Sequence, residues 1–203
     1  MVGMSVITLD DLSVANITTL LNKARYIDTH RREVAHTCDG RVLATLFYEP
    51  STRTRLSFET AMLRLGGQVI GFAGAQLASV TKGESISDTL KTVSNYVDVV
   101  AIRHPKEGAA LVAAEAASVP VINAGDGGHM HPTQTLADLA TLQSRFGRVN
   151  DLTIGLCGDL TFGRTVHSLI ETLCRFGNVR FILISPKELR TPQYVLNRIN
   201  ATP

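Results

Sequence analysis

Hydrophobic and polar positions change period along the chain, and this pattern predicts strands that alternate with helices. Runs of about four to eight mostly apolar residues are typical of buried parallel strands. Between them, apolar residues recur at helical spacing, as in Ile17, Leu20 and Leu21 after the candidate N-cap Ser13. We expect strands over 41–48, 68–72, 97–102, 119–124, 152–157 and 179–184, and helices from 14 and over 52–65, 87–96, 108–117, 132–146 and 165–176.

The regular alternation predicts an α/β protein with doubly wound parallel sheets and helices on both faces. A break at 147–151 suggests a boundary between a domain over 1–146 and a second over 147–203, with helix 132–146 as the connector. The second part holds two strands, which is too little to close such a domain alone. We therefore expect two Rossmann-like domains, of which the second is incomplete.

Composition narrows the class of protein. Hydrophobic residues make up 44% and charged residues 19%, which is typical of a globular chain. The net charge is +2, from 20 basic and 18 acidic residues, which argues against a nucleic-acid binder held by counterion release. Aromatic residues make up 5% and there is no Trp, so the core must be aliphatic.

The cysteines and the N-terminal residues indicate in which cellular compartment the protein is expected. Cys38, Cys157 and Cys174 form no C-x-x-C pair, which argues against a disulfide framework or a thiolate zinc site. The first ten residues do not resemble a secretory signal, and no apolar run reaches the ~18–20 residues of a membrane span. We therefore expect a cytoplasmic protein with no membrane partner.

The stretch after the first strand suggests an anion site. Ser51, Thr52, Arg53 and Thr54 lie where a helix begins, so free N–H groups and the positive end of the helix dipole meet hydroxyl groups and a guanidinium. The guanidinium fits phosphate oxygens as a bidentate donor. The alternative is an ordinary Ser/Thr helix cap with solvated arginines.

Three further residues follow strands or begin a helix. Arg103 comes directly after a buried strand, at the edge where open α/β sheets bind ligands, although a surface arginine is the alternative. His131 precedes Pro132 at a helix start, where an imidazole can polarise a carbonyl or simply cap the helix. Gln134 lies in the first turn, and its amide can both donate and accept.

Two loops complete the candidate chemistry. Lys82 lies in a long polar loop over 73–83, which suggests a lid, with an ordinary exposed lysine as the alternative. The stretch 155–168 runs from a strand into a helix as a dinucleotide turn would, but its glycines lack the G-x-G-x-x-G spacing. We interpret Arg164 as a carboxylate-binding residue.

Other chemistries find no support in the sequence. H-E-x-x-H, P-loop and G-x-S-x-G motifs are all absent, and no metal site is expected. Taken together, the chain resembles the aspartate transcarbamoylase catalytic chains. The matching stretches occur in the family's order and are FYEPSTRTRLSFETA, KGESISDT, IRHPKEGAA, INAGDG, HPTQTLADL and GDLTFGRTVHSL.

The resemblance implies transfer of a carbamoyl group from carbamoyl phosphate to L-aspartate in pyrimidine synthesis, with no cofactor. It also implies homotrimers with shared sites, and it leaves regulatory chains open as partners. Carbamoyl phosphate would bind Ser51, Thr52, Arg53, Thr54, Arg103, His131 and Gln134, and L-aspartate would bind Arg164 and Lys82, the latter from a neighbouring subunit. Arg53, Thr54, His131 and Lys82 would be catalytic.

Two departures keep alternatives open. The family has paired serines before the lysine loop, whereas this chain has Ala78-Ser79. The family chain is also about half as long again, so a second aspartate-binding arginine segment is missing from these residues. The alternatives are an ornithine carbamoyltransferase-like enzyme, which shares several of the motifs in looser form, and a non-catalytic module that binds carbamoyl phosphate or supports assembly.

Overall fold

The structure is a computed structural model that describes residues 3–74, 83–128 and 131–201. Contacts within the chain define two compact units. Unit 1 comprises Met1–Thr8 and Ile27–Met130, and unit 2 comprises Leu9–Tyr26 and His131–Pro203. Each unit is therefore built from two separate stretches of the sequence.

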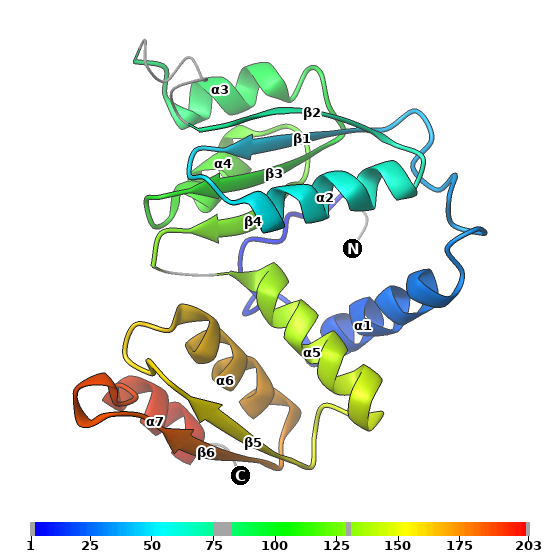
Figure 1. The fold of residues 1–203 in the computed structure, drawn as a ribbon. Helices are drawn as coiled ribbons and strands as arrows, with labels where there is room; N and C mark the ends of the chain where they lie inside the picture. Colours follow the sequence, from blue (N-terminus) through cyan, green and yellow to red (C-terminus); the bar gives the residue numbers. More distant parts are fainter. Residues whose placement is uncertain (1–2, 75–82, 129–130, 202–203) are drawn as a thin grey trace. The chain divides into compact units, whose positions relative to one another are not determined.

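Unit 1 contains a four-stranded parallel sheet (Figure 1). Its strands lie in the order β2-β1-β3-β4, so the chain first moves to one side of β1 and then returns past it to the other. This reversal is the defining feature of a doubly wound sheet. The strands are β1 (Val42–Phe47), β2 (Gln68–Ala73), β3 (Val99–His104) and β4 (Val121–Asp126).

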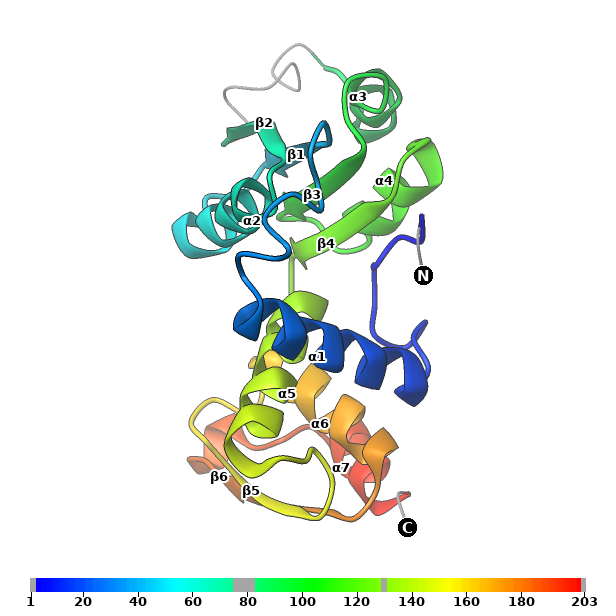
Figure 2. The same ribbon diagram turned by 90° about the vertical axis from the view of Figure 1, so that its right-hand side faces the viewer.

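Helices cover both faces of this sheet, as predicted. Figure 2 shows α2 (Thr52–Arg64) on one side, and α3 (Ile86–Val93) and α4 (Ala109–Ala116) on the other. The alternation of side chains along each strand explains the two cores. Leu43 of β1 packs with Met62 of α2, whereas its neighbour Ala44 packs in the cluster that includes Leu90 of α3.

Unit 2 has a two-stranded parallel sheet of β5 (Leu152–Cys157) and β6 (Val179–Ile184). Its helices are most of α1 (Val14–Thr29), then α5 (Pro132–Phe146), α6 (Arg164–Phe176) and α7 (Gln193–Asn200), with a short 3-10 helix over Lys187–Leu189. Alternate strand residues point inward, while Ile182 and Ile184 of β6 are half exposed on the other face.

The core of unit 2 joins residues that are far apart in the sequence. Leu9, Leu12, Ile17 and Leu21 are buried together with Leu139 of α5 and Leu173 of α6. A second cluster holds α7 against α6 through Val195, Ile170 and Cys174. The segment Leu9–Tyr26 is thus an integral part of unit 2.

All six predicted strands and all six predicted helices are present, with ends shifted by a few residues. Ser13 caps α1 as expected, since its Oγ accepts a hydrogen bond from Asn16 N at 3.1 Å. Helix α7 and the 3-10 helix were not predicted. The boundary between 146 and 147 stays a prediction, and the grouping of contacts differs from it because α5 and residues 9–26 associate with β5 and α6.

Within the described ranges, no helix is both long and apolar enough to cross a membrane.

Candidate functional site

The predicted anion site lies where the winding of the unit 1 sheet reverses. Strands β1 and β3 are neighbours, and Phe47 is the register partner of Arg103. The chain leaves β1 towards α2 and leaves β3 towards α4, which lie on opposite faces. In open α/β sheets, the crevice at the carboxyl ends of two such strands is the preferred ligand site. Ser51, Thr54 and Arg103 therefore come to one edge of the sheet.

The start of α2 has unused donor capacity. Ser51 occupies the N-cap position in extended conformation, yet its side chain does not cap the helix. Instead, Ser51 Oγ donates to Thr54 Oγ1 at 3.0 Å. The first N–H groups of a helix have no intrahelical acceptor, and the dipole adds positive potential there. This helix start is therefore electropositive, and the binding of an anion to it stays a prediction.

Two arginines in the first turn of α2 have different surroundings. Arg55 Nε donates to Glu59 Oε1 at 2.6 Å, and this carboxylate also accepts a hydrogen bond from Thr45 Oγ1 at 3.0 Å. Arg55 is thus neutralised within unit 1. Arg53 is exposed and, among the described residues, forms no ion pair. Of the two, Arg53 is the guanidinium that remains available to a ligand.

Arg103 is held at the sheet edge by its neighbours. Its side chain is largely buried, and Nη1 donates to Ala124 O of β4 at 3.3 Å. The Nε atom lies 3.3 Å from Glu49 Oε2, which forms an ion pair without hydrogen-bond geometry. A buried charge needs such partners, and here they orient the guanidinium at the end of β3. Glu49 has no signal in the sequence that predicts this contact, because a lone carboxylate before Pro50 forms no recognisable pattern.

The residues beside Arg103 stiffen the same edge. His104 Nδ1 accepts a hydrogen bond from Lys106 N at 3.0 Å, and Asp126 Oδ2 accepts one from Gly108 N at 3.0 Å. Burial lowers the pKa of His104, and the nearby positive charge of Lys106 lowers it further. His104 therefore acts as a neutral acceptor that shapes the turn after β3.

His131 and Gln134 belong to unit 2. His131 is the N-cap residue of α5 and is largely buried, and Pro132 is the first helical residue as predicted. The His131 side chain does not cap the helix, and its Nδ1 lies 3.5 Å from Thr133 Oγ1. Gln134 Nε2 donates to Asp138 Oδ1 at 2.9 Å, so one amide hydrogen is already engaged.

The remaining predicted residues are only partly covered by the structure. Arg164 begins α6, one residue before the predicted start, and its side chain lies outside what the structure describes. Lys82 and the pair Ala78-Ser79 lie outside the described residues. Their proposed roles stay predictions.

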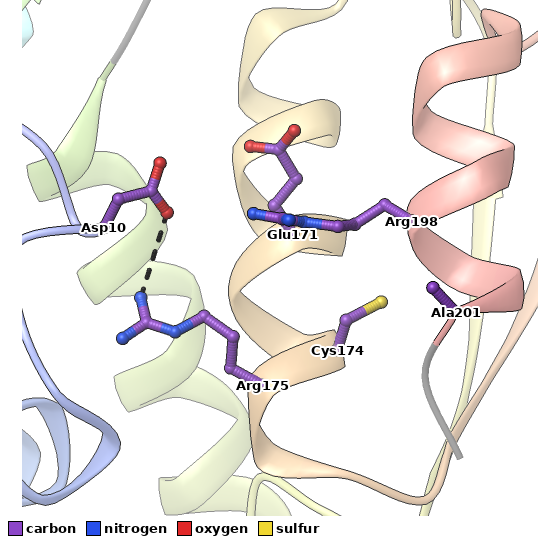
Figure 3. Close-up of a pocket in the computed structure, with 6 residues that line it drawn as sticks. All are labelled: Asp10, Glu171, Cys174, Arg175, Arg198 and Ala201. Atoms are coloured by element: carbon purple, nitrogen blue, oxygen red, sulfur yellow. Dashed lines mark ion pairs between the residues drawn. The ribbon is translucent and has the colours of Figure 1, made fainter.

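Unit 2 also has a charged pocket of about 580 Å³ (Figure 3). Arg175 Nη1 lies 4.0 Å from Asp10 Oδ1, and the Arg175 guanidinium donates to the carbonyl oxygens of Leu9 and Leu12. None of the described residues predicted to bind substrate lines this pocket. Its lining residues are Asp10, Glu171, Cys174, Arg175, Arg198 and Ala201.

In the described part of the chain, no group of three or more His, Cys, Asp or Glu side chains could hold a metal ion.

The sequence matches known proteins over its whole length. The aspartate carbamoyltransferase catalytic subunit of Bifidobacterium longum subsp. infantis is 88% identical over 202 residues, which are 100% of this chain and 63% of that relative. The corresponding subunit of Clostridium novyi is 58% identical over 198 residues, or 98% of this chain and 65% of the relative. The chain thus spans less than two thirds of the length of these curated relatives.

Solved structures agree with this match. The catalytic subunit of M. jannaschii aspartate transcarbamoylase is 47% identical, with a TM-score of 0.93 over 98% of this chain and 65% of that one. Aspartate transcarbamoylase from Trypanosoma cruzi in complex with N-(phosphonacetyl)-L-aspartic acid is 39% identical, with a TM-score of 0.87 over 98% and 64%. Residues 4–144 match the family model described as "Aspartate/ornithine carbamoyltransferase, carbamoyl-P binding domain". The chain therefore belongs to the aspartate/ornithine carbamoyltransferase family.

Proposed function

We propose that the protein containing this chain transfers the carbamoyl group of carbamoyl phosphate to the amino group of L-aspartate, which yields N-carbamoyl-L-aspartate and phosphate. The observation that carries the proposal is the uncapped start of α2 at the same sheet edge as Arg103, together with Arg53, which is exposed and forms no ion pair among the described residues. The relatives named above support aspartate as the acceptor.

The phosphate group is the natural ligand of the helix start. N–H groups at a helix start and the Arg53 guanidinium both bind a phosphate dianion well. Arg103 adds a second positive charge at the neighbouring strand end. Phosphate held in this way is a better leaving group, because the positive charges stabilise the negative charge that develops on it.

The carbamoyl carbon then reacts without a covalent enzyme intermediate. The unprotonated amine of aspartate attacks the carbonyl carbon and a tetrahedral oxyanion forms; its collapse breaks the C–O bond to phosphate, which leaves and takes up the proton that the amine loses. Donors aimed at such an oxyanion typically contribute ~3–4 kcal/mol each. We assign this role to Arg53, Thr54 and His131, and the binding of the carbamoyl amine to Gln134. No cofactor is needed.

The residues that we propose for binding the acceptor, L-aspartate, are supported by the sequence alone. We assign a carboxylate of L-aspartate to Arg164 at the start of α6, and a second contact to Lys82 from a neighbouring subunit. Trypanosoma cruzi aspartate transcarbamoylase has been solved with carbamoyl phosphate and aspartate, and also with carbamoyl aspartate and phosphate. These complexes of a 39% identical protein support the same two substrates here.

The organisation follows from the same proposal. We assign the carbamoyl phosphate-binding domain to residues 1–146 and part of the aspartate-binding domain to 147–203, with α5 as the connector. We further propose that the protein forms a homotrimer with shared active sites. It would act in the cytoplasm, in pyrimidine synthesis. Regulatory chains are a further partner that a solution mass measurement would detect.

Arg53→Ala tests the proposal. The loss of one charge-assisted bidentate contact should weaken carbamoyl phosphate binding by about 10- to 100-fold in calorimetry. Arg64→Ala is the matched control, because Arg64 is exposed in the last turn of the same helix and should bind as the unchanged protein does. Equal affinity of the two variants would contradict the proposed phosphate site.

A product assay on the complete natural protein separates the alternatives. Carbamoyl aspartate from aspartate supports the proposal, whereas citrulline from ornithine would favour the sister enzyme. Binding of carbamoyl phosphate with no product from either amino acid would indicate a non-catalytic module.

A further inference from the structure

Several hydrogen bonds hold the loop between β5 and α6, residues 158–163. Asp159 Oδ1 accepts from Thr161 N at 3.0 Å and from Phe162 N at 2.9 Å, which closes a tight turn. Leu160 is almost fully buried, and its N–H donates to Leu189 O at 3.0 Å. Thr161 Oγ1 donates to Arg190 O at 2.8 Å. The loop is thus fixed both to itself and to the segment after β6.

Two aromatic side chains from different helices complete this set of bonds. His167 Nε2 of α6 lies 2.8 Å from Leu160 O, and His167 Nδ1 lies 2.8 Å from Tyr194 Oη of α7. The two rings meet edge to face, with centroids 5.7 Å apart. Helices α6 and α7, which lie side by side, are therefore joined to the loop through one imidazole.

The chemistry of the partners determines the direction of these hydrogen bonds. A carbonyl oxygen can only accept, so Nε2 of His167 must carry a proton and donate to Leu160. In the neutral ring, Nδ1 then has a lone pair and accepts from the Tyr194 hydroxyl. Burial and the negative charge of Glu171 raise the pKa of Tyr194, so the hydroxyl keeps its proton. The Tyr194 hydroxyl therefore donates to His167 Nδ1, and His167 Nε2 donates to the Leu160 carbonyl oxygen.

These two hydrogen bonds constrain the position of Arg164, the first residue of α6. His167 lies in the first turn, three residues after Arg164, and Leu160 lies four residues before it. The backbone of Gly163 packs tightly against that of Asp159, since a Cβ at position 163 would lie 2.5 Å from Asp159 O. A shift of Leu160 relative to His167 would therefore move the backbone of Arg164.

We propose that His167 and Tyr194 are positioning residues, which fix the 158–163 loop against the first turn of α6 and so present Arg164 to a carboxylate of the amino-acid acceptor. The inference rests on the proposed function for the identity of that acceptor. Neither residue needs to touch the substrate. The effect of their loss should therefore fall on acceptor binding rather than on the chemical step.

Kinetics of the complete natural protein test this inference. Tyr194→Phe removes one hydrogen bond, and we expect KM for L-aspartate to rise about fivefold with little change in kcat or in KM for carbamoyl phosphate. His167→Ala should have a larger effect, because it leaves the Leu160 carbonyl unpaired. His167→Gln should restore most of the affinity, since the amide nitrogen of Gln can replace Nε2 as the donor. Tyr96→Phe is the matched control, because Tyr96 is 65% exposed and belongs to unit 1.

A direct measurement of the ring keeps the inference falsifiable if His167→Ala fails to fold. Nitrogen-15 shifts of His167 should show a proton on Nε2 and none on Nδ1 at pH 8, and hydrogen exchange of amides 160–167 should speed up in Tyr194→Phe. A ring protonated on Nδ1, or product formation with an unchanged aspartate KM in Tyr194→Phe, would overturn the positioning role alone. Absence of any carbamoyl aspartate from the unchanged protein would overturn the proposed function and, with it, the role of acceptor positioning.

Discussion

At the residue scale, the two ends of the unit 1 sheet use their polar groups in opposite ways. At the carboxyl ends, the start of α2 and Arg53 keep donor capacity that no described residue uses. At the amino ends, Asp98 accepts from Arg41 Nη1 at 2.6 Å and from Val42 N at 2.9 Å, so its charge is already matched. A charged group that the fold leaves unmatched is the better candidate for ligand binding.

Asp98 gives a prediction about acid stability. The hydrogen bond from Arg41, with that from Val42 N, holds the pKa of Asp98 below its ordinary range. A carboxylate with a lowered pKa stabilises the fold above its unfolded pKa of about 4, and this contribution disappears as the pH falls through the folded pKa. Asp98→Asn should therefore melt at a lower temperature than the unchanged protein at pH 7, and this difference should shrink below about pH 4.

Melting temperatures from pH 7 downwards, measured by circular dichroism, check this outcome. Asp11→Asn is the control, because Asp11 is exposed and forms no hydrogen bond or ion pair with the residues that the structure describes. A difference between Asp98→Asn and the unchanged protein that stays constant with pH would show that the carboxylate charge is not what stabilises the strand ends.

At the element scale, helix α2 is attached to β1 by polar as well as apolar contacts. Thr45 is fully buried in β1, and its hydroxyl donates to the Glu59 carboxylate that also binds Arg55. This network sets the position of the helix from its middle, so its first turn can stay open to a ligand. The proposed anion site lies at the first turn of the same helix, where Arg55 is engaged in this network and Arg53 is exposed.

Thr45→Val tests the attachment of α2. The variant keeps the shape of the side chain and removes one buried hydrogen bond, so we expect the free energy of unfolding to fall by about 1–2 kcal/mol in urea titrations. Combination with Glu59→Ala should cost less than the sum of the two single changes, because each of them removes the hydrogen bond between Thr45 and Glu59. Strictly additive losses would mean that Thr45 and Glu59 stabilise the fold independently.

The elements themselves could be predicted because their signals are local. Apolar runs gave the six strands, and Gly66 and Pro132 gave the end of α2 and the start of α5. Helix α7 was missed because Gln193–Asn200 is only 8 residues long and holds too few apolar residues to establish a helical period. The edge holding Ser51 and Arg103 was predictable from strand ends, whereas the His167–Tyr194 pair was not, since 27 residues separate its members.

At the scale of the whole molecule, the chain divides in a way that no local pattern reveals. Residues 9–26 pack with α5 and α6, which follow more than one hundred residues later, so unit 2 is discontinuous in sequence. A polar contact reinforces this packing, because Arg175 of α6 binds the carbonyl oxygens of Leu9 and Leu12 just before α1. We infer that the N-terminal segment and α6 unfold together.

Arg175→Lys tests this coupling, because lysine keeps the charge but cannot reach two carbonyl groups with one planar fork. We expect the free energy of unfolding to fall by about 1–3 kcal/mol, and hydrogen exchange of the amides in 14–21 to speed up together with that of α6. Arg180→Lys is the matched control, because Arg180 is exposed on β6 and should leave both measurements unchanged. Faster exchange in α6 with unchanged protection in 14–21 would show that the N-terminal segment is held by its apolar contacts alone, since Leu12 and Ile17 remain buried in the variant.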